Sequence, residues 1–204
     1  RFSVCLTACT ATMGAVIPRG SRVALLDFPN HGNVGDSAIW VGELAVLRHL
    51  GASVAYVATT TTFREDVLRR ELGREGLVLL HGGGNFGDLW PRHHAHREAV
   101  VAALGDFPLI QLPQSIHFED PSRLAQTADV LRRHPRLTVL ARDQRSLGVA
   151  TNQLGIPAVL CPDSVFAITA PRPRLPPDRD VLWLSRDDKE GPGDTTGLSN
   201  GPVP

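Results

Sequence analysis

The sequence has few cysteines, few aromatic residues and no excess of charge, and each absence excludes a class of protein. Its three cysteines, Cys5, Cys9 and Cys161, are an odd and scattered set. Such a set does not build a disulfide framework, and it lacks the CxxC spacing of a zinc site. We therefore expect reduced thiols in a cytoplasmic protein and no bound metal. Aromatic residues make up only 5% of the chain, which argues against a stacking platform for single-stranded nucleic acid.

Basic and acidic residues balance, so the formal net charge is zero. This balance leaves no global field that would attract nucleic acid or an acidic membrane surface. No apolar run approaches the roughly 18 residues of a membrane span. The mildly apolar residues 4–17 are rich in threonine and lack the firm apolar centre of a signal peptide. We predict a disordered leader over residues 1–20, no membrane span and no nucleic-acid partner.

The chain does have a regular alternation of apolar runs and amphipathic segments. The apolar runs predict strands at residues 22–28, 53–58, 77–81, 109–112, 137–141 and 158–161. The segments between them predict helices at residues 37–50, 63–72, 91–104, 121–133 and 143–154, with Asp36 or Ser37 as the cap of the first and Asp120 as the cap of the fourth. Strands that alternate with helices form βαβ units, so residues 21–169 predict an α/β domain with a Rossmann-like parallel sheet and flanking helices.

The composition changes after residue 169. Residues 170–179 are rich in proline and predict a semi-rigid linker. Residues 180–190 begin with a new apolar run, and residues 191–204 contain glycine, proline and small polar residues, which predict a disordered tail. Because a single strand cannot build a domain, we expect residues 180–190 to be the start of a truncated second domain.

Glycine-rich loops follow the predicted strands and carry the candidate chemistry. The stretch LVLLHGGGNFGDLW, residues 77–90, ends a buried strand with three glycines. The Gly-Asn-x-Gly-Asp pattern of residues 84–88 repeats that of residues 32–36. Neither copy is the GxGxxG of a dinucleotide site or a P-loop, so nucleotide binding through these devices is unsupported. Ligands of open α/β sheets bind outside the carboxyl ends of the strands, and we expect a binding site at this edge.

Several of these residues also have a purely structural explanation. Glycine is a general turn residue, and an aspartate before a helix is a common cap. His31, His81 and His117 each lie beside a predicted strand end, which favours a proton-transfer or phosphate-contacting role. The histidines at residues 93, 94 and 96 lie near a helix start without a metal-ligand pattern, so we predict an exposed polar turn there.

Six motifs, in order, resemble those of the polysaccharide pyruvyl transferase family. They are GNVGDSAIW (32–40), HGGGNFGDLW (81–90), LPQSIHF (112–118), ARDQRSL (141–147), PDSVF (162–166) and LSRDDKE (184–190). The resemblance implies transfer of a pyruvyl group from phosphoenolpyruvate to a sugar of a cell-surface polysaccharide, forming a ketal without a metal or organic cofactor. The acceptor would be a saccharide or a lipid-linked oligosaccharide. The resemblance also implies two facing Rossmann-like domains, as in GT-B glycosyltransferases, of which this chain would carry one half.

Under this resemblance the side chains at the strand ends divide into two roles. The candidates for general acid or base are Asp36, Asp88 and His117. The candidates for substrate contact, with arginine expected to bind carboxylate or phosphate bidentately, are Asn33, Gly83, Gly84, Asn85, Gln114, Ser115, Arg142 and Arg186.

Two other functions stay open at this point. One is half of a GT-B-type glycosyltransferase that uses a nucleotide-sugar, which tight nucleotide-sugar binding without phosphoenolpyruvate binding would indicate. The other is a non-catalytic, carbohydrate-binding remnant, which unchanged activity of Asp36→Asn and Arg186→Ala in a full-length version would indicate. The family's second domain is expected to supply much of the phosphoenolpyruvate site, so we expect this chain alone to release no phosphate from phosphoenolpyruvate.

Overall fold

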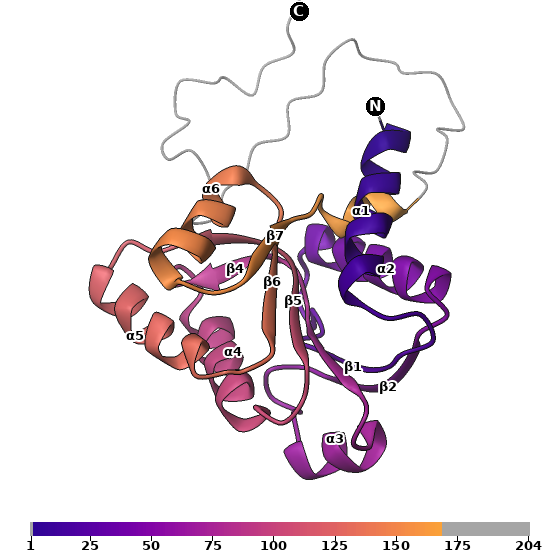
Figure 1. Cartoon of the computed structure of the whole chain (residues 1–204), viewed down its shortest axis with the longest axis horizontal. Coiled ribbons are helices and arrows are strands. Elements are labelled where there is room, and N and C mark those ends of the chain that lie inside the picture. The colour runs from indigo at the N-terminus through magenta and orange to yellow at the C-terminus, as the bar shows by residue number, and fades with distance from the viewer. Residues whose placement is uncertain (1, 169–204) are drawn as a thin grey trace, which may run out of the picture. The chain divides into compact units, whose positions relative to one another are not determined.

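The computed structural model describes residues 2–168 and shows an α/β fold built on a parallel sheet (Figure 1). The strands are β1 (Arg22–Leu26), β2 (Ser53–Ala58), β3 (Leu77–Leu80), β4 (Gly83–Gly87), β5 (Leu109–His117), β6 (Leu137–Ala141) and β7 (Ala158–Leu160). Their order is β2-β1-β3-β5-β6-β7, with β4 also paired to β5, and all pairings between them are parallel. The predicted α/β parallel sheet is confirmed. The predicted linker (170–179), second-domain start (180–190) and tail (191–204) lie outside the described residues.

The order of the strands marks a place for a ligand. The chain moves from β1 to β2 at one edge, then returns to the other side of β1 to form β3 and continues outward. The direction of winding therefore reverses between β1 and β3. In doubly wound sheets, ligands bind at the carboxyl ends of the two strands that flank such a reversal.

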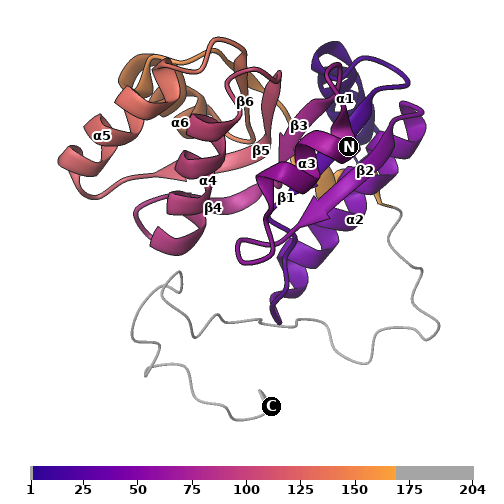
Figure 2. The ribbon, with the colours of Figure 1, turned by 90° about the horizontal axis from the view of Figure 1, so that it is seen from below.

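Helices cover both faces of the sheet. One face carries α1 (Phe2–Val16) and α2 (Val34–His49), and the other carries α3 (Glu65–Leu72), α4 (Pro91–Ala103) and α5 (Pro121–Arg132) (Figures 1 and 2). The predicted helix over residues 143–154 consists of α6 (Gln144–Gly148) and a π-helix, Val149–Leu154. A short 3₁₀-helix, Ser164–Ala167, follows β7 and packs against α2.

The helix α1 shows that the prediction of a disordered leader over residues 1–20 is wrong. Cys9, Met13 and Ile17 recur every fourth residue and therefore form one stripe along the helix. All three are fully buried, and they pack in one cluster with Trp40 and Leu47 of α2. The threonines between these positions dilute the apolar pattern, so composition alone did not reveal the stripe.

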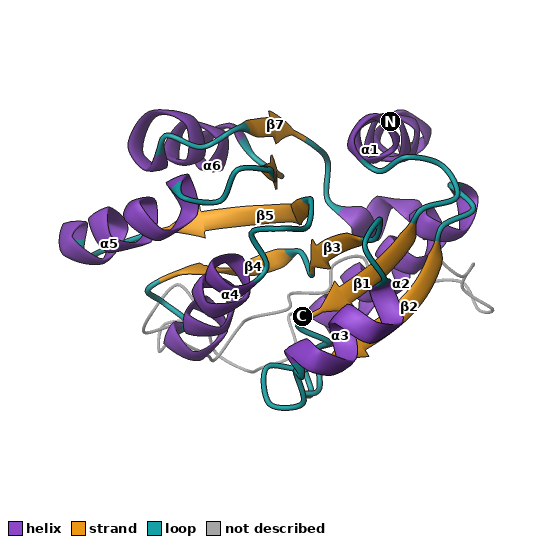
Figure 3. Ribbon diagram, turned by 60° about the horizontal axis from the view of Figure 1, so that its bottom comes forward, coloured by secondary structure: helices purple, strands orange, loops and turns teal. Residues whose placement is uncertain are grey.

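The glycine-rich stretch after β3 is a strand where the sequence predicted a loop. Strands β3 and β4 lie end to end beside β5 (Figure 3), because β3 pairs with residues 109–111 and β4 with residues 114–117. β5 is correspondingly longer than the predicted 109–112. Two residues of β4, Gly84 and Asn85, lie opposite Ser115 alone, which is the arrangement of a β-bulge. Gly87 has a φ of 130°, and a Cβ there would collide with the carbonyl oxygen of His117.

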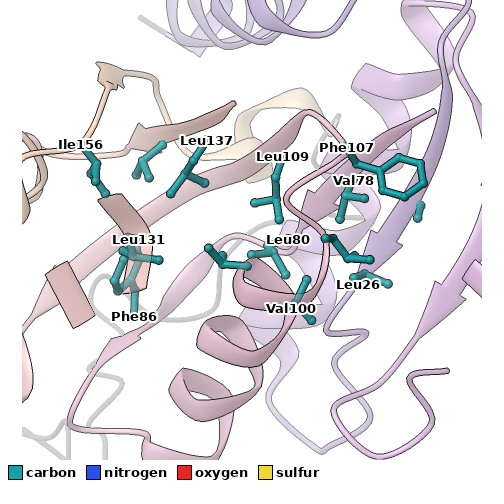
Figure 4. Packing of buried hydrophobic residues seen from close by; sticks show 14 of the residues in the cluster. Leu26, Val78, Leu80, Phe86, Val100, Phe107, Leu109, Leu131, Leu137 and Ile156 are labelled. Carbon is teal, nitrogen blue, oxygen red and sulfur yellow. The ribbon is translucent and has the colours of Figure 1, made fainter. Parts of the chain in front are cut away.

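Two apolar clusters fill the space between the sheet and its helices. The cluster on the side of α3, α4 and α5 includes Leu26, Val78, Leu80, Phe86, Val100, Phe107, Leu109, Leu131, Leu137 and Ile156 (Figure 4). Leu77 and Leu79 belong to the other cluster, so the side chains of β3 alternate between the two faces. This alternation continues at His81, whose side chain lies on the α2 side.

Candidate functional site

A buried polar cluster lies where β1, β3 and β4 meet, and Asn85 is at its centre. The side-chain nitrogen of Asn85 donates to Asp27 over 3.2 Å. Its side-chain oxygen accepts from Arg97 at 2.6 Å and from Gln114 at 2.8 Å. Arg97 also donates to Gln111 over 2.6 Å. The bulge in β4 therefore places Asn85 so that it joins the ends of three strands to helix α4.

Asp27 and Arg97 form the charged part of this cluster. Burial alone would raise the pKa of Asp27, but the hydrogen bond from His93 and the positive charge of Arg97 outweigh it and lower the pKa. Burial lowers the pKa of Arg97 to about 10, so the guanidinium keeps its proton at neutral pH. His93 Nδ1 lies 2.9 Å from Asp27 Oδ1. The cluster thus contains a carboxylate and a guanidinium that are almost completely withdrawn from solvent.

A second buried pair, Glu43 and His81, lies on the α2 side of the sheet. Glu43 Oε2 lies 2.8 Å from His81 Nδ1, and Glu43 Oε1 accepts from the backbone N–H of Gly82 at 2.8 Å. Burial opposes protonation of the imidazole, but the neighbouring carboxylate of Glu43 outweighs it and raises the pKa of His81. His81 Nε2 has no hydrogen-bond partner within residues 2–168. The pair holds the main chain in place at the entry to β4.

The space beside Gly83 is bordered by two acceptor oxygens. Gly83 has a φ of 119°, and a Cβ there would lie 3.3 Å from Asp36 Oδ1 and 3.8 Å from Gln114 Oε1. Gln114 Oε1 is buried and accepts no hydrogen bond from the described residues. The Asp36 side chain is 25% exposed and lies 3.6 Å from His31. Because a buried acceptor without a donor is costly, Gln114 Oε1 favours a partner that brings a hydroxyl donor.

A more open cluster lies at the ends of β5 and β6. Ser115 Oγ accepts from Arg142 Nε and donates to Asp143, both over 2.8 Å. Arg142 Nη1 donates to Asp163 over 2.7 Å, while Arg142 Nη2 donates to no acceptor within residues 2–168. The Arg142 side chain is 29% exposed. A guanidinium that is fixed at one end and open at the other is suited to bind a carboxylate or phosphate.

Two predicted acid/base candidates lie apart from these clusters. Asp88 Oδ2 accepts from the backbone N–H groups of Glu119 and Asp120, each at 2.8 Å, and these bonds outweigh its slight burial and lower the pKa of Asp88. Asp88 therefore ties the end of β4 to the loop after β5. His117 is 41% exposed and lies 3.5 Å from Arg145 Nη2, in a separate cavity.

Comparison with known sequences decides the family. A family model described as polysaccharide pyruvyl transferase matches residues 33–198. The chain belongs to the polysaccharide pyruvyl transferase family. It is 38% identical over 180 residues to "Pyruvyl transferase 1" of Schizosaccharomyces pombe, and the aligned region covers 83% of this chain and 45% of the relative. It is also 31% identical over 180 residues to "Putative pyruvyl transferase EpsO" of Bacillus subtilis, and the aligned region covers 86% of this chain and 54% of the relative. The chain thus spans about half the length of the curated relatives it matches.

The structure of this pyruvyl transferase family member brings together most of the predicted substrate-contact residues. Gly83, Gly84, Asn85 and Gln114 share the region around Asp36, and Ser115 binds Arg142 one residue further along β5. Asn33 caps α2, because its side-chain oxygen accepts from the N–H of Gly35, and its contact with the substrate stays a prediction. The sequence predicted Asp36 or Ser37 as the cap of this helix, and that prediction is wrong, because the cap is Asn33. Arg186 lies outside the described residues.

The histidines at the start of α4 are not the exposed polar turn that the sequence predicted. His94 is fully buried, with its Nδ1 accepting from the N–H of Gly87 and its Nε2 next to Thr127 Oγ1 at 2.8 Å. Burial, helped by the charge of Arg97, lowers the pKa of His94 to about 4. The prediction failed because residues 94, 97 and 101 form the buried stripe of α4.

The other contributors that sequence reasoning missed are Asp27, Glu43, His93, Arg97 and Gln111. Asp27 is the first residue after β1, and its position at a strand end was a usable signal. Glu43, His93 and Arg97 reach the site from helices, where the sequence gives no such signal. Within residues 2–168, no group of three His, Cys, Asp or Glu side chains is arranged to hold a metal ion, and no helix is long and apolar enough to cross a membrane.

Proposed function

We propose that this protein transfers a pyruvyl group from phosphoenolpyruvate to a saccharide and forms a ketal. The observation that carries the proposal is the combination, on one sheet edge, of two acceptor oxygens beside Gly83 and the half-open guanidinium of Arg142. The first suits sugar hydroxyls and the second suits the anionic groups of phosphoenolpyruvate. Family membership supports the reaction type, and a saccharide or lipid-linked oligosaccharide is the proposed acceptor.

The proposed reaction has two steps. In the first, a sugar hydroxyl oxygen bonds to the central carbon of phosphoenolpyruvate, and the methylene carbon takes a proton. In the second, another hydroxyl of the same sugar bonds to that carbon, and the bond from the carbon to the phosphate oxygen breaks. Inorganic phosphate leaves and the ketal closes. Each hydroxyl loses a proton, so the reaction needs a base near the hydroxyls and an acid near the methylene carbon. None of these steps requires a metal or an organic cofactor.

Asp36 is the proposed base among the three predicted acid/base candidates. Its Oδ1 borders Gly83 and its side chain is open to solvent in part. Asp88, by contrast, already accepts two backbone hydrogen bonds, and His117 lines a cavity that includes neither Asp36 nor Gly83. Gln114 Oε1 is proposed to accept a hydrogen bond from the second sugar hydroxyl, which satisfies its buried lone pairs.

Arg142 is the proposed anion contact. Its Nε and Nη1 are held by Ser115 and Asp163, so the orientation of the guanidinium is set before a ligand arrives. The remaining N–H groups are available to the carboxylate or phosphate of phosphoenolpyruvate. Arg186 of the LSRDDKE motif is proposed as a second cation for the same substrate.

The first test is calorimetric titration of the chain with phosphoenolpyruvate. Binding is measured before turnover because the chain spans about half the length of its curated relatives. We expect Arg142→Ala to weaken binding at least about tenfold, since a charge-assisted hydrogen bond contributes roughly 1.5–3 kcal/mol. Arg74→Ala, which removes an exposed arginine before β3 and thus at the opposite edge of the sheet, serves as the matched control. Equal affinity of the wild type and Arg142→Ala would overturn the assignment of Arg142.

The second test separates the proposed reaction from its alternatives. Mass spectrometry is used to search for a pyruvyl ketal on saccharides incubated with phosphoenolpyruvate and a version of the protein extended to the length of its curated relatives. We expect Asp36→Asn to abolish the product while phosphoenolpyruvate still binds. Tight binding of a nucleotide-sugar, with none of phosphoenolpyruvate, would instead support a glycosyltransferase.

A further inference from the structure

A cavity of about 330 Å³ lies at the carboxyl end of β5, and its lining includes neither Gly83 nor Gln114. Its walls come from the end of β5, from α5, and from α6 with the π-helix that follows it. Gln114 and His117 are three residues apart on β5, so the cavity lies about 10 Å along the strand from the site. The volume is at the small end of the range for small-molecule sites, which is about 300–1,000 Å³.

The cavity has an apolar side formed by Ile116, Phe118, Leu124 and Val149. The core residue Phe86 fixes the position of Phe118, because the two rings pack edge-on at a centroid distance of 6.3 Å. These contacts come from the core, so the apolar wall is firm. A flat apolar wall of this kind suits the C–H face of a sugar ring better than it suits a bare anion.

The polar side of the cavity consists of amides and one arginine. Gln144, Asn152 and Gln153 carry side-chain amides and are exposed, as is Arg145. No carboxylate lines the cavity. Amides both donate and accept hydrogen bonds, and so do sugar hydroxyls, whereas a fully ionised phosphate group only accepts.

The surroundings of His117 also disfavour an anion. Arg145 Nη2 lies 3.5 Å from His117 Nδ1, and Glu119 lies 3.6 Å from His117 Nε2. Both ring nitrogens of His117 thus already have a neighbour, and one neighbour is a carboxylate. Arg145 is the only lysine or arginine among the residues that line the cavity and it is exposed to solvent, so the cavity offers no concentrated positive charge to a phosphate.

We propose that this cavity is a saccharide-binding subsite that holds a sugar unit of the acceptor beyond the unit that reacts beside Gly83. This inference rests on the proposed function, because it requires an acceptor of more than one sugar. In this role His117 contacts the acceptor and does not perform the acid/base chemistry.

The experiment compares a monosaccharide with a trisaccharide. The full chain is titrated with neutral methyl glucoside, galactoside and mannoside, and with the trisaccharide of each sugar, and binding is followed by backbone amide NMR. We expect at least one trisaccharide to bind about tenfold more tightly than its monosaccharide and to shift the amide signals of residues 144–153. Arg145→Ala with Asn152→Ala removes this advantage and leaves the monosaccharide affinity unchanged. Both side chains are exposed, so the double variant keeps the fold.

Arg74→Ala is again the matched control and keeps the trisaccharide advantage. The proposal is overturned if no trisaccharide gains over its monosaccharide, if none binds at all, or if the double variant retains the gain. It is also overturned if inorganic phosphate, and no saccharide, shifts the signals of residues 144–153. Failure of the proposed function gives a different result, since the wild type would then fail to bind phosphoenolpyruvate in the separate titration.

Discussion

Arg97 and Arg142 each hold together a polar cluster at the carboxyl edge of the same sheet, yet the two clusters differ in exposure. Arg97 is 3% exposed, and Asn85, Gln111 and the face of Phe86 surround its guanidinium. Arg142 is 29% exposed and keeps an Nη2 group that donates to none of the described residues. Similar chemistry therefore serves two purposes. The buried cluster fixes the ends of the strands, and the open one is ready for a ligand.

The difference predicts opposite behaviour of the two arginines on substitution. Removing a buried cation leaves its hydrogen-bond acceptors unsatisfied and a nearby buried carboxylate less compensated, which is strongly destabilising. Removing one member of a partly exposed pair has little effect on stability, because water solvates the partner that remains. Three measurements test this contrast, beginning with the largest expected effect.

Arg97→Ala should lower the free energy of unfolding by about 3–5 kcal/mol, because Asn85 and Gln111 lose buried hydrogen bonds and the buried Asp27 loses a nearby positive charge. Urea denaturation followed by circular dichroism measures the change. A double variant, Arg97→Met with Asp27→Asn, removes both charges and should recover part of the loss. A loss below about 1 kcal/mol in Arg97→Ala would show that the buried cluster does not depend on Arg97 in solution.

The protein should also lose stability in mild acid, and the buried His94 is the main cause. Its pKa is lowered to about 4 in the folded state, from about 6.5 in the unfolded chain, so the unfolded state binds the proton first as the pH falls. Stability should therefore fall between about pH 6.5 and 4, by about 3 kcal/mol in total. His81, whose pKa is raised, contributes stability at low pH and loses it as the pH rises, so it does not cause this fall.

The check on this prediction is the difference between the wild type and His94→Gln across the same pH range. The glutamine cannot take up the proton, so its stability curve should be flatter and the two curves should converge as the pH falls. Parallel curves would contradict the assignment to His94. Asp27, whose pKa is lowered, adds a further loss only as the pH falls below its unfolded value of about 3.9.

Arg142→Ala should change the free energy of unfolding by less than about 1 kcal/mol, because its partners Ser115 and Asp163 remain in contact with water. The same urea titration measures it beside Arg97→Ala. The variant should still lose phosphoenolpyruvate binding, so stability and binding separate at this residue. A destabilisation as large as that of Arg97→Ala would place Arg142 among the structural residues.

The sequence predicted the parallel sheet and the edge at which Asp36, Asn85, Gln114 and Arg142 gather, because parallel strands bring their carboxyl ends together. It did not predict that the glycine stretch after β3 is itself a strand. Glycine carries no strand signal, and the pairing of Gly83–Gly87 depends on a partner about 30 residues away in β5.

The sequence also did not predict the polar side chains that helices contribute to the candidate site. Glu43 and Arg97 lie among the buried residues of α2 and α4, in positions where an amphipathic pattern leads one to expect apolar side chains. Their partners are strand-end groups that only the folded chain brings near. The stripe of α1 was missed for a related reason, since its burial depends on contacts with Trp40 and Leu47.

Asp27 has a φ of 66°, in the left-handed region of the backbone. A residue with a side chain loses roughly 1–2 kcal/mol there relative to the right-handed region, whereas glycine does not. The usual engineering rule, which places glycine at such positions to gain stability, therefore fails at this residue. Asp27→Gly would relax the main chain and at the same time remove the only carboxylate that Asn85 and His93 both contact within residues 2–168. Efforts to stabilise this protein by placing glycine at positions of positive φ should therefore leave Asp27 unchanged.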